Sequence, residues 1–243
     1  MTSEIVAVAM SGGVDSSVAA ALLKEQGHEV VGITLQLWPK AAADLDKHHG
    51  CCSLDAVEDA RRVATSLRIP YYVLDVQEEF RARVVEPFLI DYEEGRTPNP
   101  CISCNNEVKF DLLLGKARSI GAAALATGHY ARIERDGGVF RLLRAVDPGK
   151  DQSYVLYGLG QDELARARFP LGGWHKEAVR ARARELGLIT ADKPDSVEIC
   201  FVTGGDYREL LARRQADSGG EIRDIEGRPL GTHKGVWNYT VGQ

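Results

Sequence analysis

The sequence predicts an α/β fold, in which a parallel sheet carries helices on both faces and is followed by the start of a small β-rich domain. The first two-thirds of the chain alternate short apolar runs with longer segments of helical periodicity, which is typical of parallel strands joined by helices. After about Thr203 the pattern changes to short strands spaced by glycines, which indicates a small β module. We therefore expect one α/β domain over residues 1–203 and the beginning of a second domain over residues 204–243.

The expected elements follow in order along the chain. An apolar, β-branched run predicts the first strand at 5–10. Helical spacing of apolar residues predicts a helix at 14–26, and Gly27 is a typical residue to end it. The same arguments predict strands at 29–37, 71–76 and 122–127, helices at 53–67, 77–92 and 106–120, and a hairpin with strands 130–135 and 139–144 around Asp136-Gly137.

Composition and charge narrow the class of protein. Of the 243 residues, 44% are hydrophobic, which is close to the globular average and argues against disorder. The longest apolar run is far too short to span a membrane, and the N-terminus lacks the basic and apolar regions of a signal peptide, so we expect a soluble, cytoplasmic protein with no membrane partner. The net charge of −5 excludes a strongly basic nucleic-acid footprint over the whole chain.

Two local groups of basic residues are nevertheless candidates for contact with nucleic-acid phosphates. Lys176, Arg180 and Arg184 recur at i, i+4 and i+8, so they form one stripe on a predicted helix. The second group surrounds the predicted hairpin and consists of Arg132, Arg135, Arg141, Arg144 and Lys150. For both groups, a solvated charged face is the alternative interpretation.

The junction between the first strand and the first helix reads Ser11-Gly12-Gly13-Val14-Asp15-Ser16. Glycines let the backbone approach a ligand closely, and the N–H groups at a helix N-terminus point toward an anion. The hydroxyls of Ser11, Ser16 and Ser17 add donors, and the Asp15 carboxylate can hold a divalent cation that bridges phosphate oxygens. A glycine turn with a serine cap is the plainer interpretation, but this composition directly after an apolar strand favours a phosphate site.

The stretch "SGGVDS" resembles the signature of the PP-loop ATP pyrophosphatases, which cleave ATP between its α and β phosphates and adenylate a substrate oxygen. Four further stretches, "GRTPNPCISCNNEVKF", "ATGHYA", "KDQSYVLYGL" and "DSVEICFV", follow in that order. Together the five closely resemble the bacterial tRNA-specific 2-thiouridylases, which place sulfur on C2 of the wobble uridine. The resemblance runs from about Glu4 to Gln243, and the family continues into a C-terminal β-barrel that we expect this chain to lack.

This resemblance implies ATP-dependent 2-thiolation of a uridine in the anticodon stem-loop of tRNA, with release of AMP and pyrophosphate and with Mg²⁺ at Asp15. It places ATP at Ala9, Met10, Ser11, Gly12, Gly13, Val14, Asp15, Ser16, Leu35 (adenine) and Gly128. It places the target base or other parts of the tRNA at Asn99, Pro100, Cys101, His129, Lys150, Asp151 and Gln152. From the residues alone, His129 is as well interpreted as a structural histidine, and Lys150-Asp151-Gln152 as the start of a helix.

Two cysteines are the candidates for sulfur chemistry. Cys104 lies where a helix is predicted to begin, so the helix dipole should lower the pKa of its thiol and favour the thiolate. The resemblance gives Cys200 the persulfide that attacks the adenylated uridine. It makes Cys104 the catalytic partner, able to form a disulfide with Cys200. With Asp15, these two cysteines form the expected catalytic set.

Cys101 departs from the family pattern, because many relatives have aspartate there. Several interpretations stay open. In one interpretation, Cys101, Cys104 and Cys200 ligate an iron–sulfur (4Fe-4S) cluster, since thiolates are the usual ligands of such clusters. Alternatively, Cys101 and Cys104 form a redox dithiol, or Cys101 is a bystander. Structural zinc would need Cys51 and Cys52 as well, and adjacent cysteines chelate poorly.

The long loop at 38–50, with His48, His49 and the following Cys51 and Cys52, is interpreted as a flexible loop rather than a metal site. Two other functions compete with tRNA thiolation. A PP-loop ligase acting on a small molecule would not need the cysteines, and a nucleotide-binding module would show no turnover. The identity of the sulfur donor, a protein or sulfide, does not follow from the sequence.

Overall fold

The computed structural model describes residues 4–37, 54–195, 199–202, 207–212 and 219–240. Its centre is a five-stranded sheet in the order β3-β2-β1-β4-β7, and every neighbouring pair is parallel. This confirms the predicted parallel sheet: four of its strands end within a few residues of those expected, whereas the fifth and shortest strand was not predicted. The strands are β1 (Ile5–Ala9), β2 (Glu29–Gln36), β3 (Tyr71–Asp75), β4 (Ala124–Ala126) and the short β7 (Ala167–Arg168).

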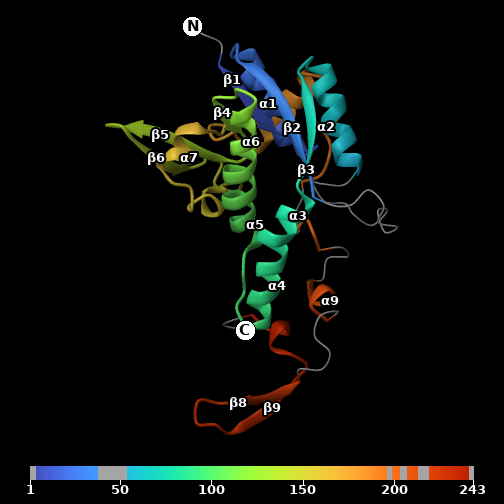
Figure 1. Cartoon of the computed structure of the whole chain (residues 1–243), viewed down its shortest axis with the longest axis vertical. Helices are drawn as coiled ribbons and strands as arrows, with labels where there is room; N and C mark the ends of the chain where they lie inside the picture. Colours follow the sequence, from blue (N-terminus) through green and yellow to red (C-terminus); the bar gives the residue numbers. More distant parts are fainter. Residues whose placement is uncertain (1–3, 38–53, 196–198, 203–206, 213–218, 241–243) are drawn as a thin grey trace.

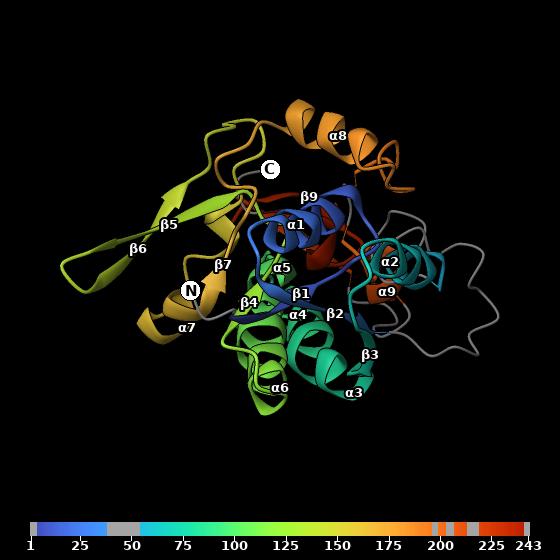
Figure 2. The same cartoon turned by 90° about the horizontal axis from the view of Figure 1, so that it is seen from above.

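Helices cover both faces of the sheet, as predicted (Figure 2). Successive residues of β1 point to opposite faces, so Val6 and Val8 join one apolar cluster and Ala7 joins another. The first cluster includes residues of α1 (Val14–Glu25), α2 (Leu54–Ser66) and α8 (Lys176–Glu185). The second includes residues of α6 (Leu114–Ser119), the 3₁₀ turn Ser153–Val155 and α7 (Gln161–Arg166).

Two helical runs continue through π-helical segments. The first consists of α3 (Gln77–Phe80), the π-helical segment Arg81–Val85 and α4 (Glu86–Glu93), in agreement with the helix expected at 77–92. The second consists of α5 (Pro100–Ser103), the π-helical segment Cys104–Leu113 and α6.

The prediction for the second helical run was wrong at its start, which lies at Pro100 rather than at residue 106. The side-chain oxygen of Asn99 accepts a hydrogen bond from the backbone N–H of Cys101 at 3.1 Å, and Pro100 occupies the first turn. An asparagine cap followed by proline is a typical helix start, so "NP" was a usable signal.

A hairpin projects from the side of the α/β unit, as predicted (Figure 1). It pairs β5 (Ala131–Asp136) with β6 (Val139–Arg144). The turn differs by one residue from the expectation, because Asp136 pairs with Val139. Gly137 and Gly138 therefore form the two-residue turn, and both have the positive φ (55° and 94°) that such a turn requires.

The last part of the chain passes beside α4 and then extends beyond the end of the α3–α4 helical run (Figure 1). It contains the short helix α9 (Tyr207–Ala212), the antiparallel hairpin of β8 (Gly220–Arg223) and β9 (Pro229–His233), and a 3₁₀ turn at Val236–Asn238. The β hairpin agrees with the predicted change to short strands. No helix among the described residues is long and apolar enough to cross a membrane.

A third apolar cluster joins this last part to the helical run. Phe88 of α4 contacts the ring of Phe201 edge-on, with 5.1 Å between centroids, and Tyr92 stacks on Tyr207 at 4.6 Å. Trp237, which is 6% exposed, belongs to the same cluster. Cys104 and Cys200 pack against it as half-buried residues.

Candidate functional site

The loop between β1 and α1 lies at the point where the strand order of the sheet reverses. β1 has β2 on one side and β4 on the other, so the loops after β1 and β4 diverge from neighbouring strand ends. In parallel sheets, ligands bind in the crevice at this place. The first-turn N–H groups of α1 have no acceptor within the helix, so they are available to an anion.

The serine hydroxyls of this phosphate loop, defined as Ser11–Ser16, hold its shape. The backbone N–H of Ser11 donates to Ser16 Oγ at 3.1 Å, and Ser16 Oγ donates to the Gly13 carbonyl at 3.2 Å. Ser17 Oγ donates to the same carbonyl at 2.8 Å, and Ser17 is fully buried. The expectation that Ser17 supplies a donor to phosphate is therefore wrong for this arrangement, because its hydroxyl is engaged inside the protein.

Two glycines bring backbones close together at the phosphate loop. Gly12 has φ +70°, and a Cβ there would overlap the backbone carbonyl of Ala56 in α2. Gly128, just after β4, approaches the loop from the other side, where a Cβ would lie 2.7 Å from the backbone nitrogen of Ser16 and 2.9 Å from the carbonyl carbon of Asp15. The structure thus brings together the loop and Gly128, both of which were predicted to bind ATP.

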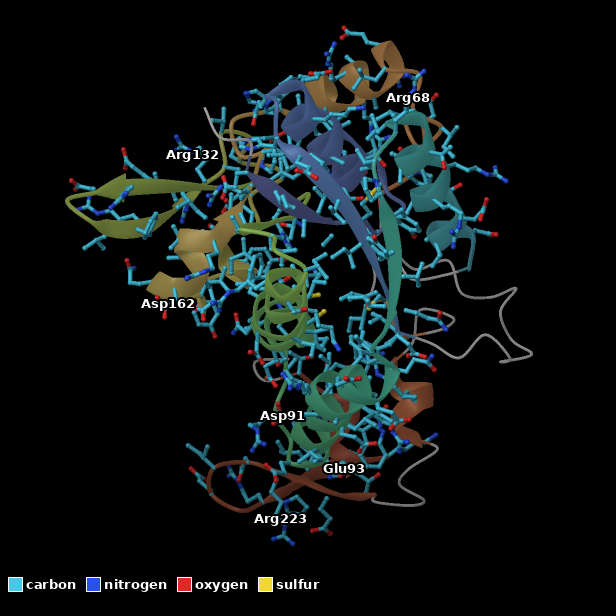
Figure 3. All side chains as sticks on the ribbon, turned by 45° about the horizontal axis from the view of Figure 1, so that its top comes forward. Arg68, Asp91, Glu93, Arg132, Asp162 and Arg223 are labelled. Atoms are coloured by element: carbon cyan, nitrogen blue, oxygen red, sulfur yellow. The ribbon has the colours of Figure 1, made fainter. Side chains whose placement is uncertain are left out.

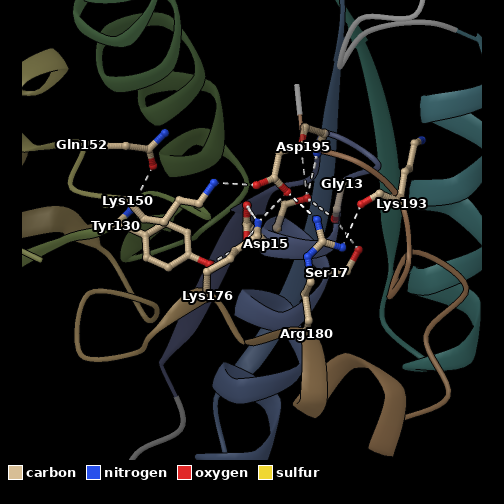
Figure 4. A network of polar contacts seen from close by, with 12 residues as sticks. Gly13, Asp15, Ser17, Tyr130, Lys150, Gln152, Lys176, Arg180, Lys193 and Asp195 are labelled. Atoms are coloured by element: carbon tan, nitrogen blue, oxygen red, sulfur yellow. Dashed lines mark hydrogen bonds and ion pairs between the residues drawn. The ribbon is translucent and has the colours of Figure 1, made fainter. Parts of the chain in front are cut away.

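The Asp15 carboxylate accepts hydrogen bonds from a lysine and a tyrosine side chain (Figure 4). Lys176 Nζ lies 2.8 Å from Oδ1 and 2.7 Å from Oδ2, and the Tyr130 hydroxyl donates to Oδ1 at 2.7 Å. Burial, and then the charge of Asp15, raise the pKa of Tyr130 well above its usual value, so the hydroxyl keeps its proton and remains a donor. Lys176 is only 8% exposed although it carries a charge.

A second carboxylate, Asp195, gathers three cations beside the phosphate loop (Figure 4). Its Oδ1 lies 2.8 Å from Lys176 Nζ and 2.7 Å from Arg180 Nη2, and its Oδ2 accepts from Lys150 Nζ at 2.8 Å. Burial alone would raise the pKa of Asp195, but the hydrogen bonds from Lys150 and Lys176 outweigh it and lower the pKa to about 2. The carboxylate is therefore ionised at neutral pH.

These contacts correct the interpretation of the basic stripe on α8. Lys176 and Arg180 turn inward to Asp15 and Asp195, and Arg180 Nη1 also donates to the carbonyls of Ala191 and Lys193. The helical spacing was right, but the stripe faces the phosphate loop. Arg184 alone of the three stays mainly exposed, where it pairs with Asp192 at 2.8 Å.

Lys193 supports the phosphate loop from the other side. Its Nζ donates to the Gly12 carbonyl at 3.0 Å and to Asp59 of α2 at 2.7 Å. Sequence analysis gave Tyr130, Lys193 and Asp195 no role. Tyr130 and Asp195 stand inside two of the stretches singled out, "ATGHYA" and "DSVEICFV", and this position was the available signal.

Each residue of the segment Lys150-Asp151-Gln152 makes a polar contact, and Lys150 and Gln152 connect it to this network. Lys150 pairs with Asp195. Asp151 accepts hydrogen bonds from the backbone N–H of Ala145 and the Ser153 hydroxyl, both at 2.8 Å. Gln152 Oε1 accepts from the backbone N–H of Tyr130 at 3.0 Å. A short 3₁₀ turn at Ser153–Val155 follows, in place of the α-helix start considered above.

Cys104 and Cys200 lie on the same apolar cluster although 96 positions separate them, and both are half-buried. The expectation that Cys104 stands at a helix start was wrong, because the helix begins four residues earlier at Pro100. Cys101 occupies the first turn instead and is exposed. The helix dipole therefore acts more directly on Cys101 than on Cys104.

The metal-site interpretations were tested on the arrangement of donors. Among the residues that the structure describes, no group of three or more His, Cys, Asp or Glu side chains could hold a metal ion. Cys101, Cys104 and Cys200 therefore do not form a ready cluster site in this conformation. His48, His49, Cys51 and Cys52 lie outside the described residues, so the loop and zinc interpretations stay untested there.

His129 is buried and hydrogen-bonded. Its Nδ1 lies 2.7 Å from Thr127 Oγ1, and its ring meets the edge of Phe169. Burial, followed by the nearby charge of Lys109, lowers the pKa of His129 well below its usual value, so the ring is neutral. These surroundings agree with a structural histidine, and its contact with tRNA stays a prediction.

The other ligand candidates occupy strand ends or loops nearby. Leu35 is half-buried near the end of β2, and Ala9 ends β1. The Met10 carbonyl accepts from the Thr34 hydroxyl at 2.6 Å, which ties the residue before the phosphate loop to β2. Arg132 lies on β5 of the projecting hairpin (Figure 3), and its Nε donates to the Arg144 carbonyl at 2.9 Å. Arg141 pairs with Asp136 at 2.7 Å, and both side chains are more than half exposed.

Comparison with protein families gives two consecutive matches. The family model described as "tRNA methyl transferase HUP domain" matches residues 4–204. The model described as "tRNA methyl transferase PRC-barrel domain" matches residues 208–243.

Curated relatives match nearly the whole chain. A protein of Geobacter metallireducens named "tRNA-specific 2-thiouridylase MnmA" is 56% identical over 244 residues, which cover 98% of this chain and 66% of that protein. A protein of the same name from Heliobacterium modesticaldum is 54% identical, with 99% of this chain and 63% of that protein covered. The chain thus spans about two-thirds of the length of these relatives.

Solved structures share the fold at low sequence identity. A 4-thiouridine synthetase–RNA complex with bound ATP has a TM-score of 0.54 at 18% identity, over 87% of this chain and 50% of that chain. A glutamine-dependent NAD⁺ synthetase from Acinetobacter baumannii, in complex with ADP, has a TM-score of 0.50 at 13% identity, over 80% and 32%. The match confirms the predicted α/β fold.

Proposed function

The chain belongs to the tRNA-specific 2-thiouridylase family, and from this premise we propose that it replaces the C2 oxygen of the tRNA wobble uridine with sulfur in a reaction that consumes ATP. The observation that carries the proposal is the phosphate loop at the N-terminus of α1, with Gly128 packed against its backbone and Lys176 beside it. The relatives' name supplies the substrate. The products would be AMP, pyrophosphate and 2-thiouridine.

ATP would bind across the ends of β1, β2 and β4. The loop amides and the N-terminus of α1 would receive its phosphates, and Ala9, Leu35 and Gly128 would border the nucleotide. The uridine C2 oxygen would attack the α-phosphorus, and pyrophosphate would leave. The base would first leave the anticodon stack, because its C2 oxygen must reach the phosphate.

Asp15 is the residue that would hold Mg²⁺. One carboxylate is enough, because Mg²⁺ is often held by one or two carboxylates together with substrate phosphates and waters. Asp15 fits this role in its place at the first turn of α1, although Lys176 now occupies both of its oxygens. When bound, the ion would neutralise charge on the leaving pyrophosphate.

Cys200 and Cys104 would transfer the sulfur. A Cys200 persulfide would form by transfer of the outer sulfur of a donor protein's persulfide, or by attack of sulfide on a Cys104–Cys200 disulfide, which releases the Cys104 thiolate. Its terminal sulfur would attack C2 and displace AMP, leaving the base joined to Cys200 through a disulfide. The Cys104 thiolate would then attack the Cys200 sulfur and release 2-thiouridine. The resulting Cys104–Cys200 disulfide would be reduced by an external thiol before the next cycle.

The cluster interpretation finds no assembled site among the described residues, so we derive no step through it. It is tested by measuring iron and acid-labile sulfide in protein purified without oxygen. Stoichiometric amounts that vanish in Cys101→Ser would establish Cys101, Cys104 and Cys200 as ligands. Absence of both elements, also after reconstitution, would leave the persulfide route, with Cys101 a bystander.

The tRNA would be held by two separate segments. Asn99, Pro100 and Cys101 form the start of α5 and would receive the target base, while Lys150, Asp151 and Gln152 would contact the RNA next to the phosphate loop. His129, which lies between these segments in the sequence, would be a further contact. Asn99 already uses its side-chain oxygen as a helix cap, so its amide N–H₂ group is the part left to contact a base.

The proposal is tested by measuring pyrophosphate release and 2-thiouridine formation with tRNA and a sulfide source. We expect Cys200→Ser to abolish thiolation while ATP binding persists, which separates the sulfur step from nucleotide binding. Thiolation by Cys200→Ser would refute the role of Cys200. AMP release without tRNA that survives loss of both Cys104 and Cys200 would instead favour a small-molecule ligase. ATP binding with no pyrophosphate release in the presence of tRNA would favour a nucleotide-binding module.

A further inference from the structure

The carboxylate of Asp195 joins two groups of residues that the proposed function treats separately. Lys150 belongs to the segment expected to contact RNA, whereas Lys176 lies against Asp15 in the phosphate loop. Both ammonium groups bind the same carboxylate, Lys150 at Oδ2 and Lys176 at Oδ1, each at 2.8 Å (Figure 4). A single residue, Asp195, therefore links the protein segment expected to contact RNA with the phosphate loop.

Lys176 is built into this position from three directions. It is the first residue of α8, and its backbone N–H donates to Asp147 Oδ2 at 2.9 Å. Its side chain is 10% exposed, and its Nζ lies between the carboxylates of Asp15 and Asp195. Its Nζ also lies 5.8 Å from the centre of the Tyr130 ring. A buried ammonium at the first turn of α1 is well placed to bind a phosphate group that enters the loop.

The two lysines are also reachable from one cavity. A surface cavity of about 450 Å³ is lined by Asp147, Gly149, Lys150, His175, Lys176 and Glu177. An RNA phosphate approaching Lys150 and a phosphate held by Lys176 would thus occupy adjoining places. Without ligands, each ammonium group is neutralised by a carboxylate instead.

The balance of charge fixes how two ligands would affect each other. Asp195 is held by three cations, Lys150, Lys176 and Arg180. An anion that draws one cation away leaves the carboxylate more dependent on the others, because a partly buried charge is costly when it loses its partners. Removing the second cation therefore costs more than removing the first.

We propose that Asp195 is a positioning residue that holds Lys176 at the phosphate loop and opposes the simultaneous binding of pyrophosphate at Lys176 and of RNA at Lys150. Bound RNA would thereby favour release of the pyrophosphate formed during adenylation, which would hinder the reverse reaction. This inference rests on the proposed function, because it takes Lys150 to contact RNA and the loop to bind phosphates.

The test is to titrate the 243-residue chain with pyrophosphate, with and without a saturating anticodon stem-loop RNA, by calorimetry. We expect RNA to weaken pyrophosphate binding about fivefold or more, the lower end of typical coupling between sites. By reciprocity, saturating pyrophosphate should weaken RNA binding by the same factor. In Asp195→Asn the factor should fall below about twofold, because the neutral amide no longer ties the two lysines together.

Controls separate this coupling from general repulsion between two polyanions. Asp192→Asn removes a nearby exposed carboxylate that pairs with Arg184, so it should keep the full coupling. Lys150→Gln, assayed at RNA concentrations that restore saturation, should lose it and serves if Asp195→Asn does not fold. Equal coupling in the wild type, Asp195→Asn and Lys150→Gln would overturn the inference and indicate general repulsion. If the wild type binds both ligands and neither affects the other, the inference is overturned but the proposed function stands. If the wild type fails to bind pyrophosphate or RNA, both the inference and the proposed function are overturned.

Discussion

Replacing Gly128 by alanine tests how closely the end of β4 must approach the phosphate loop. The added Cβ would lie 2.7 Å from Ser16 N, 2.9 Å from Asp15 C and 3.0 Å from Asp15 Cβ. The first two atoms are backbone, so no side chain can rotate away to make room. Either the end of β4 or the first turn of α1 must move.

Overpacking of this kind costs about 1–3 kcal/mol. In a chain of this size, each kcal/mol lowers the melting temperature by about 2–4 °C, so Gly128→Ala should melt about 2–12 °C lower. If strain is relieved by displacing the phosphate loop, nucleotide affinity falls as well, and about 1.4 kcal/mol corresponds to tenfold. Thermal unfolding followed by circular dichroism and titration with a non-hydrolysable ATP analogue measure the two effects.

Gly115→Ala is the matched control. Gly115 lies in α6, and a Cβ there would meet nothing within 4 Å. Alanine within a helix should stabilise the protein by about 0.5–1 kcal/mol and leave nucleotide binding unchanged. If Gly128→Ala matches the wild type in both melting temperature and nucleotide affinity, the close packing of β4 on the phosphate loop is not a constraint and our account of Gly128 is refuted.

Three further predictions concern the cap, the apolar cluster and the acidic network. Asn99→Ala should lower the free energy of unfolding by about 1 kcal/mol, because the helix cap is lost, whereas Asn99→Ser should keep most of the wild-type stability because serine also caps helices. Equal melting temperatures of the wild type and Asn99→Ala would contradict the capping role. Phe201→Ala should cost about 3–5 kcal/mol and speed alkylation of Cys200, because Phe201 is 4% exposed and packs on Phe80 and Phe88; an unchanged alkylation rate would show that this packing does not shield Cys200. Because the pKa of Asp195 is lowered from 3.8 to about 2 on folding, its ion pairs stabilise the protein above the ordinary pKa and are lost as the pH falls toward the folded value. The difference in melting temperature between the wild type and Asp195→Asn should therefore shrink on going from about pH 5 to about pH 3, and a constant difference would contradict the sign.

The fold could be predicted because its elements depend on local patterns. Alternation of apolar runs and helical segments located the four longer parallel strands, and the phosphate loop followed from six consecutive residues. The start of α5 was missed because the helix was expected only from residue 106, although Asn99 and Pro100 are typical residues for the start of a helix.

The polar network of the site could not be predicted in the same way. Asp15 and Lys176 are separated by 161 positions, and no local period relates them. The stripe of Lys176 and Arg180 was found by its helical spacing, which cannot say whether that face meets solvent or a buried carboxylate. Asp195 was not predicted because a single aspartate carries no pattern, and its partners come from two other parts of the chain, Lys150 and helix α8.

The third apolar cluster bears on how the chain can be divided experimentally. The two family matches meet near residue 206, which invites cutting the chain there. Yet Leu211 and Trp237, 2% and 6% exposed, lie beyond that point and pack in the same cluster as Phe88 and Phe201. A chain shortened at this boundary would lose part of the apolar cluster on which Cys200 packs and would expose aromatic side chains to water. The boundary between the two sequence families is therefore not a boundary in cooperative folding, and the half-buried thiol depends on both sides of it.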